Sequence, residues 1–132
     1  MKITALLTNI LLISSITLAS PDVVDDIAVA IRSGNAKELA KFFNANINLN
    51  IPENEGFYSK AQAELILKDF FSKNPLKSFT ILHQGSSKDG ARYAIGNMVI
   101  EKGTFRAYFY MKKESGHYYI HEFSLSEEDE DK

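Results

Sequence analysis

The sequence predicts an α+β fold in which N-terminal helices pack on one face of a curved, mainly antiparallel sheet. Apolar residues recur at helical spacing through the first half of the chain, up to Phe71. From Lys77 onward the spacing changes to two, and turn sequences divide this half into four runs. Helices that precede strands are typical of α+β domains, whose helices gather on one side of the sheet.

Residues 1–19 have the features of a secretory signal peptide. Lys2 gives a positive start, and the apolar run that follows is too short and too diluted by polar residues for a membrane span. Thr17 and Ala19 are small residues at the recognition positions, so we expect cleavage after Ala19 and a mature chain that begins at Ser20. The expected location is therefore the periplasm or the medium. The chain has no cysteine, so no lipid anchor is expected, nor any membrane span after cleavage.

The mature chain is long enough for one domain, which we place at residues 20–126. This region holds 13 Lys and Arg against 12 Asp and Glu. Its near neutrality argues against a nucleic-acid partner and against a polybasic membrane surface. Residues 127–132 contain five acidic residues and one lysine, and we expect a disordered tail that aids solubility, with calcium or partner binding as the alternative.

The first two helices are predicted to form a hairpin. Residues 21–32 place apolar side chains at helical spacing behind Pro21 and Asp22, which suit a first turn. Ser33-Gly34 ends this helix, and Asn35 with Glu38 three residues on forms a capping pattern for a short second helix. The apolar residues of the pair are Val24, Ile27, Ala28, Ile31, Leu39, Phe42 and Phe43.

A short edge strand is predicted between the second and third helices. Apolar residues alternate with asparagine over residues 47–51, until Pro52, which cannot donate to a ladder. A loop that contains Gly56 follows. Ser59 and Gln62 form a capping box for the third helix. This helix is expected to end at Asn74-Pro75 and to present Leu65, Ile66, Phe70 and Phe71.

The strands after residue 77 are predicted to form a meander with turns at 86–90, 101–103 and 114–116. If Lys102-Gly103 is a two-residue turn, Ile100 pairs with Phe105 and each strand shows one apolar face. A three-residue turn would offset the pairing by one and mix the two faces. We prefer the register that gives each strand one apolar face. The inner face then consists of Ala94, Gly96, Met98, Ile100, Phe105, Ala107, Phe109 and Met111.

The opposite face of this hairpin is too apolar and aromatic for water alone. It presents Tyr93, Ile95, Asn97, Val99, Arg106, Tyr108, Tyr110 and Lys112. A one-faced antiparallel sheet is usually polar outside, so this composition predicts that another protein surface covers it. We expect a homodimer whose interface includes Tyr93, Asn97, Arg106, Tyr108 and Tyr110. A different protein, an extended polymer, or surface aromatics with no partner are the alternatives.

The order of elements and several short sequence motifs indicate a family resemblance. The motifs are GNAKELAKFF (34–43), YSKAQA (58–63), DFF (69–71), KDGARYAIG (88–96) and GTFR (103–106). Together they resemble a group of small exported bacterial domains of unknown function within the nuclear transport factor 2-like, or cystatin-like, superfamily. The resemblance implies a cone-shaped α+β fold and an exported protein. It implies no reaction, although cones of this kind often dimerise through the outer sheet face.

A cone can hold a small apolar ligand between its helices and its sheet. Tyr58, His83, Gly96 and Met98 are the residues predicted around the mouth of such a pocket. Gly96 is included because a missing side chain lets a ligand or a helix approach the sheet. The alternative is close packing over Gly96, since seven phenylalanines are available to fill the core: Phe42, Phe43, Phe70, Phe71, Phe79, Phe105 and Phe109.

No catalytic residue, metal site or cofactor is predicted. Within the meander only Glu122 is a carboxylate inside a strand, and an isomerase-type site needs at least one buried carboxylate. His117 and His121 lie roughly 13 Å apart along a strand, too far to share a metal. The sequence thus predicts a non-catalytic exported interaction module. The alternatives are a small isomerase or hydrolase that uses Glu122 or His83 in another register, and an accessory subunit of an envelope assembly.

Overall fold

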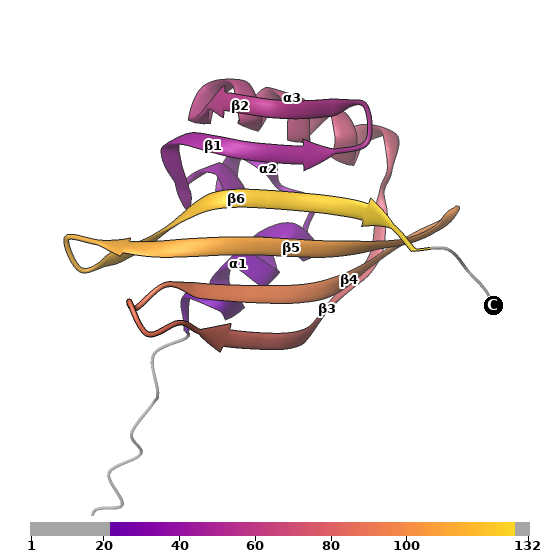
Figure 1. Cartoon of the computed structure of the whole chain (residues 1–132). Helices are drawn as coiled ribbons and strands as arrows, with labels where there is room; N and C mark the ends of the chain where they lie inside the picture. The colour runs from indigo at the N-terminus through magenta and orange to yellow at the C-terminus, as the bar shows by residue number, and fades with distance from the viewer. Residues whose placement is uncertain (1–21, 129–132) are drawn as a thin grey trace, which may run out of the picture.

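A computed structural model describes residues 22–128 (Figure 1). The predicted signal peptide and residues 129–132 of the predicted tail lie outside this range. The helices are α1 (Val23–Arg32), α2 (Ala36–Ala40) and α3 (Lys60–Lys73). The strands are β1 (Phe43–Ile51), β2 (Asn54–Ser59), β3 (Leu76–Ser86), β4 (Arg92–Ile100), β5 (Gly103–Glu114) and β6 (His117–Glu127).

All strands described belong to one six-stranded sheet in the order β2-β1-β6-β5-β4-β3. Neighbouring strands are antiparallel, except that β1 runs parallel to β6. The helices lie together behind the sheet in Figure 1, so one face of the sheet is covered and the other is open to the viewer. The predicted α+β class and the mainly antiparallel curved sheet are confirmed, and the parallel pair makes the sheet mixed.

The strand before α3 differs from its prediction. It begins at Phe43, which the sequence pattern assigns to the second helix, and it lies between β2 and β6 instead of at the edge. The predicted loop around Gly56 is strand β2, which forms that edge. A tight turn at Pro52 and Glu53 folds β2 back on β1, and Glu53 adopts a positive φ of 73° there.

Helix α3 begins with the predicted capping box, because the Ser59 side chain accepts from the Gln62 backbone N–H and the Gln62 side chain accepts from the Ser59 N–H. Its packing face differs from the prediction in one residue. Leu65 is 64% exposed, whereas Leu67 is fully buried. Leu65 is two residues from each of Ala63 and Leu67, which turns its side chain away from the buried stripe.

The turn between β4 and β5 is Glu101-Lys102, not Lys102-Gly103. Ile100 therefore pairs with Gly103 and Met98 with Phe105, two residues away from the predicted partners. The predicted faces are nevertheless confirmed, because a displacement by two preserves the alternation of a strand. Every non-glycine residue assigned to the inner face is buried.

The sheet continues into the segment predicted as a tail. β6 ends at Glu127, and the backbone N–H of Glu128 donates to the carbonyl of Thr104 at 2.9 Å. The side chain of Glu128 also pairs with Arg106. The folded region therefore reaches two residues beyond the predicted boundary at residue 126.

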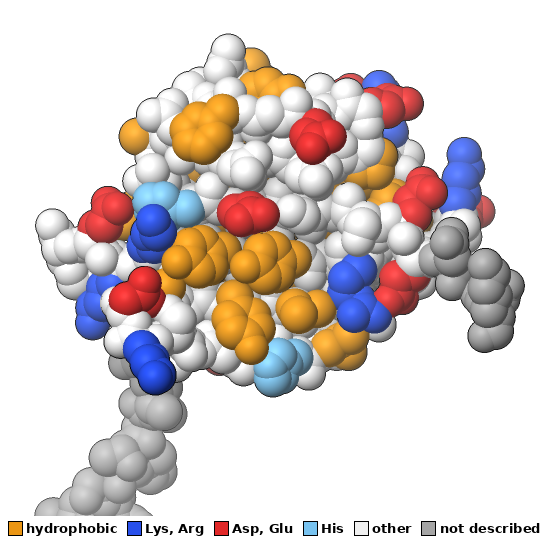
Figure 2. Space-filling view, in the orientation of Figure 1, with side chains coloured by type: hydrophobic (Ala, Val, Ile, Leu, Met, Phe, Trp, Pro, Cys, Tyr) orange, Lys and Arg blue, Asp and Glu red, His pale blue; other side chains and the backbone are white. Residues whose placement is uncertain are grey.

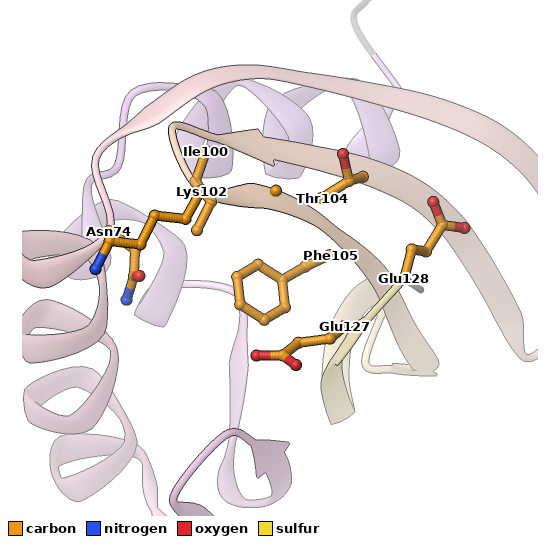
Figure 3. A pocket seen from close by; sticks show the side chains of 8 residues that line it. Asn74, Ile100, Lys102, Thr104, Phe105, Glu127 and Glu128 are labelled. Carbon is orange, nitrogen blue, oxygen red and sulfur yellow. The ribbon is translucent and has the colours of Figure 1, made fainter. Parts of the chain in front are cut away.

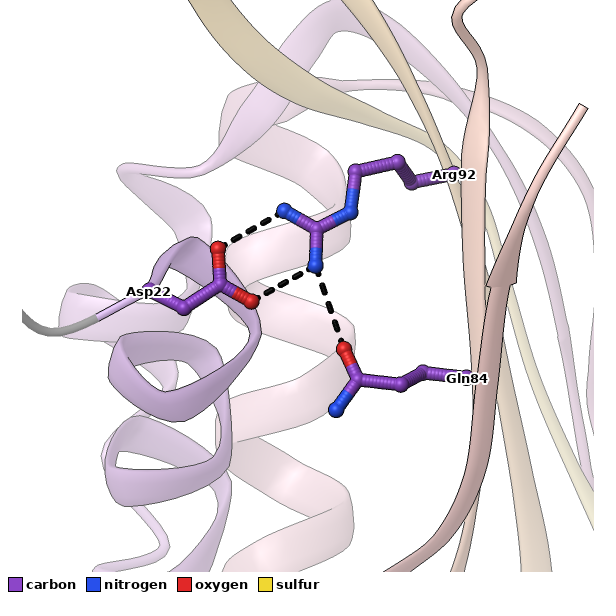
Figure 4. A network of polar contacts seen from close by, with 3 residues as sticks. All are labelled: Asp22, Gln84 and Arg92. Carbon is purple, nitrogen blue, oxygen red and sulfur yellow. Dashed lines mark hydrogen bonds and ion pairs between the residues drawn. The ribbon is translucent and has the colours of Figure 1, made fainter.

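The start of α1 is joined to the sheet by an ion pair. The two terminal guanidinium nitrogens of Arg92, Nη1 and Nη2, donate to the Asp22 carboxylate at 2.7 and 2.6 Å, and Nη2 also donates to Gln84 (Figure 4). Hydrogen bonds from Arg92 lower the pKa of Asp22 below its ordinary value of 3.8. Asp22 is the first described residue, so this contact fixes the end of the domain that follows the predicted leader.

This ion pair gives a pH-dependent contribution to stability. A carboxyl group whose pKa is lowered by folding stabilises the native state above the unfolded pKa, and this contribution disappears as the pH falls through the lower folded value. We expect Asp22→Asn to be less stable than wild type at pH 7, with a difference that shrinks steadily below pH 3.8. Urea unfolding of both proteins between neutral and acidic pH measures the difference in their free energies of unfolding. A difference that is independent of pH would contradict this role of Asp22.

Candidate functional site

The open face of the sheet carries a cluster of large side chains on β4 and β5. We call Tyr93, Ile95, Asn97, Val99, Arg106, Tyr108 and Tyr110 the outer patch. The strand register places Tyr93 opposite Tyr110, Ile95 opposite Tyr108 and Asn97 opposite Arg106. All seven are half-buried without any helix above them. Figure 2 shows apolar side chains gathered at the centre of this face, with charged side chains and histidine around them.

The Tyr93 ring lies over β3 on the open face. A Cβ on Gly85 would lie 2.7 Å from the Tyr93 hydroxyl, so the ring occupies the space that a side chain at 85 would fill. The same hydroxyl lies 3.0 Å from His83 Nε2. His83 is thus an exposed residue beside the outer patch, not at an interior pocket. Sequence reasoning missed Gly85, although a glycine inside a strand signals close approach of another group.

Charges of opposite sign lie on two sides of the tyrosines. Arg106 precedes Tyr108 on β5 and pairs with Glu128, while Glu122 on β6 lies opposite Tyr110. Burial raises the pKa of Tyr108, and the negative charge of Glu122 adds to this effect. The Tyr108 hydroxyl therefore stays protonated and remains a hydrogen-bond donor at neutral pH. Glu122 is half-buried on the open face, so it does not supply a carboxylate inside the fold.

The outer patch also contains polar atoms that lack partners. Asn97 Oδ1 and Arg106 Nε are both inaccessible to solvent and form no hydrogen bond within residues 22–128. Buried polar atoms without partners cost free energy, roughly 1–3 kcal/mol for each group. The two atoms belong to directly opposed residues, so the polar part of the patch is incompletely satisfied by the chain itself.

The four residues predicted around a pocket mouth are not brought together. Met98 is fully buried, and Tyr58 on β2 packs against the core. Gly96 lies under Phe79 and the Thr80 carbonyl, since a Cβ at this position would be 2.7 Å from the Phe79 ring and 2.8 Å from that oxygen. His83 is on the other face. The structure therefore has the alternative arrangement, in which the core packs closely over Gly96.

Within the described region there is neither a buried ionisable residue nor a cluster of metal-binding side chains. Among residues 22–128 no polar or charged residue is buried. In the same range no cluster of three or more His, Asp or Glu side chains is placed to hold a metal ion. None of the helices that the structure describes is both long enough and apolar enough to cross a bilayer.

Helices on one face of a curved six-stranded sheet are a fold that this chain shares with nuclear transport factor 2-like (NTF2-like) proteins of known structure. An NTF2-like protein of unknown function from Cytophaga hutchinsonii shares this fold with a TM-score of 0.55, at 15% identity over 80% of this chain and 86% of that chain. A family model described as a domain of unknown function, DUF4783, matches residues 24–126. The chain belongs to the DUF4783 family.

Two crystal structures of DUF4783 family proteins are similar to this chain. The protein from Bacteroides uniformis is 29% identical with a TM-score of 0.77, over 83% of this chain and 100% of that chain. The protein from Bacteroides ovatus is 27% identical with a TM-score of 0.74, over 80% of this chain and 94% of that chain. No curated protein matches the sequence. The similarities identify the family and the fold of this chain.

Proposed function

We propose that this chain is an exported, non-catalytic interaction module that associates with a second copy of itself through the outer patch. The observation that carries the proposal is the concentration of three tyrosines, two aliphatic residues and one arginine on a sheet face with no helix above it. Tyrosine and arginine are enriched at protein interfaces, since they combine large contact area with hydrogen-bonding groups.

The charges around the patch favour a second copy as the partner. Arg106 and Tyr110 are four residues apart on one strand, which is about 13 Å. Glu122 lies beside Tyr110, so opposite charges flank Tyr108 at similar distances. A twofold axis near Tyr108 would place Arg106 of one copy, which is also paired with Glu128 of its own chain, against Glu122 of the other. Such self-complementarity is what an isologous dimer requires.

Export is proposed from the leader sequence. The processing site predicted after Ala19 leaves two residues before Asp22, which contacts Arg92 and begins the described domain. The mature protein would then meet its second copy outside the cytosol.

The interface proposal is tested by Tyr108→Glu. A carboxylate at the centre of the patch would be desolvated in the dimer and would lie between the acidic groups of both copies. We expect dimer dissociation to become easier by about 30-fold or more, as for a central interface residue. Sedimentation velocity over a range of protein concentrations measures the change.

The matched control for this test is Leu65→Glu. Leu65 is a large apolar residue that is more exposed than Tyr108, and it lies on α3, on the helix side of the sheet. The control variant should keep the dimer. Equal effects of Tyr108→Glu and Leu65→Glu would contradict the outer patch as the interface.

A further inference from the structure

A cleft with no residue in common with the outer patch lies where α3, β6 and the β4–β5 turn end (Figure 3). It consists of two adjoining hollows of about 340 and 270 Å³ that share Asn74, Lys102, Phe105 and Glu127. We call it the end cleft. Sites for small molecules have volumes of roughly 300–1,000 Å³, so the two hollows together are large enough for a small ligand.

The floor of the end cleft is apolar. Phe105 and Ile100 are 6% and 7% exposed, and they show only these small areas to the hollow. Phe70 packs its ring edge-on against Phe105, with centroids 5.5 Å apart at 70°. Such a floor favours a ligand with an apolar body.

The rim carries opposite charges on two sides of Phe105. Figure 3 shows Lys102 beside Asn74 on one side of the ring and Glu127 on the other. Of the other charged residues at the cleft, Asp69 pairs with Lys73 at 3.0 Å and Glu128 pairs with Arg106, while Glu53, at the Pro52 turn, is a further acidic group on the rim. Lys102 and Glu127 form no ion pair within the described range, so both remain available to a ligand.

We propose that the end cleft binds a small zwitterion with an apolar body, of the chemical class of a short peptide or an apolar amino acid. Its ammonium group lies beside Glu127, its carboxylate beside Lys102, and its apolar side chain over Phe105. Each charged group of the ligand then meets the opposite charge, while the body covers the exposed part of the floor.

The test uses leucyl-leucine and two capped forms that each lack one charge. N-acetyl-leucyl-leucine has no ammonium group, and leucyl-leucine amide has no carboxylate. Titrations of ¹⁵N-labelled protein are followed at the backbone amides of Asn74, Thr104 and Phe105. Wild type should bind the uncapped dipeptide best, and each cap should weaken binding by about two- to fivefold, as expected for one exposed ion pair.

Single-charge variants connect each end of the ligand with its residue. Glu127→Gln should remove the advantage of a free ammonium group, so this variant binds the uncapped and acetylated peptides equally. Lys102→Gln should remove the advantage of a free carboxylate, so this variant binds leucyl-leucine and leucyl-leucine amide equally. Glu101→Gln, at an exposed turn residue that does not line the cleft, should behave as wild type.

A second arm distinguishes the two possible sources of the zwitterion. Free leucine that binds as tightly as leucyl-leucine would assign the cleft to amino acids, whereas weaker binding of leucine would assign it to peptides. The proposal is overturned if none of these probes shifts the three amides, if the capped and uncapped forms bind wild type equally, or if the preference persists in Glu127→Gln and Lys102→Gln. Because the outer patch shares no residue with the cleft, these results leave the dimer proposal unaffected.

Discussion

Gly96→Ala is expected to lower the free energy of unfolding by about 1–3 kcal/mol, the range for forcing extra volume into a packed core. The new methyl group would meet the Phe79 ring at 2.7 Å and the Thr80 carbonyl at 2.8 Å. Phe79 is 2% exposed and the carbonyl belongs to the backbone of β3, so neither can move away easily. Urea unfolding measures the loss.

Gly85→Ala provides the contrast for this prediction. A Cβ at Gly85 would be equally close to a neighbour, but that neighbour is the tip of the Tyr93 ring, at 2.7 Å on an open face. The ring can rotate outward, so we expect a loss of less than about 1 kcal/mol, typical of surface sites. If Gly96 were the mouth of an open pocket, alanine there would instead be neutral or stabilising by roughly 0.4–1 kcal/mol. That outcome would contradict the packing described here.

Phe109→Ala is expected to have the largest effect on stability, a loss of about 3–5 kcal/mol in the free energy of unfolding. Phe109 is 0% exposed at the centre of the inner face, opposite Phe123 on β6 and Ala94 on β4. Its removal leaves a cavity between sheet and helices. Phe57→Ala is the matched control, because Phe57 on β2 is 73% exposed, and it should change stability by less than about 0.5 kcal/mol.

Denaturant unfolding of both variants separates core from surface. Similar losses for Phe109→Ala and Phe57→Ala would mean that the inner and outer faces are not assigned correctly. The same experiment is informative about register, because a displacement of β5 by one residue would exchange the two faces.

The meander was predictable because the alternation of its residues has a physical cause. Only one register parity buries Met98, Phe105 and Phe109 together, so the faces follow from the sequence. The exact turn does not follow from the sequence. Turns at Glu101-Lys102 and at Lys102-Gly103 give strand pairings that differ by two residues, and both pairings bury the same side chains. Local backbone preferences at the turn decide between them.

The strand β2 and the pocket could not be predicted for different reasons. Residues 54–59 include Asn, Glu, Gly and Ser, which have low strand propensity, and they become a strand only because β1 offers a neighbouring edge. The space beside Gly96 is filled by Phe79, which is distant in sequence and approaches through strand pairing. A pattern read along one strand does not contain such information.

The outer patch was predicted by composition, and its residues are brought together on one face by β4 and β5. The pairing of Arg106 with Glu128 could not be predicted, because the acidic composition of residues 127–132 indicates a solvated tail. Whether the patch binds a second copy is a property of two molecules, and neither alternation nor burial in one chain determines it.

Native mass spectrometry of the protein purified from its own host tests the central claim most directly. The account predicts a homodimer with twice the mass of a chain that begins at Ser20, and a monomer for Tyr108→Glu under the same conditions. A monomeric wild type at every concentration, or a complex with a different protein on the same patch, would contradict self-association. A mass that retains residues 1–19 would contradict the proposed processing.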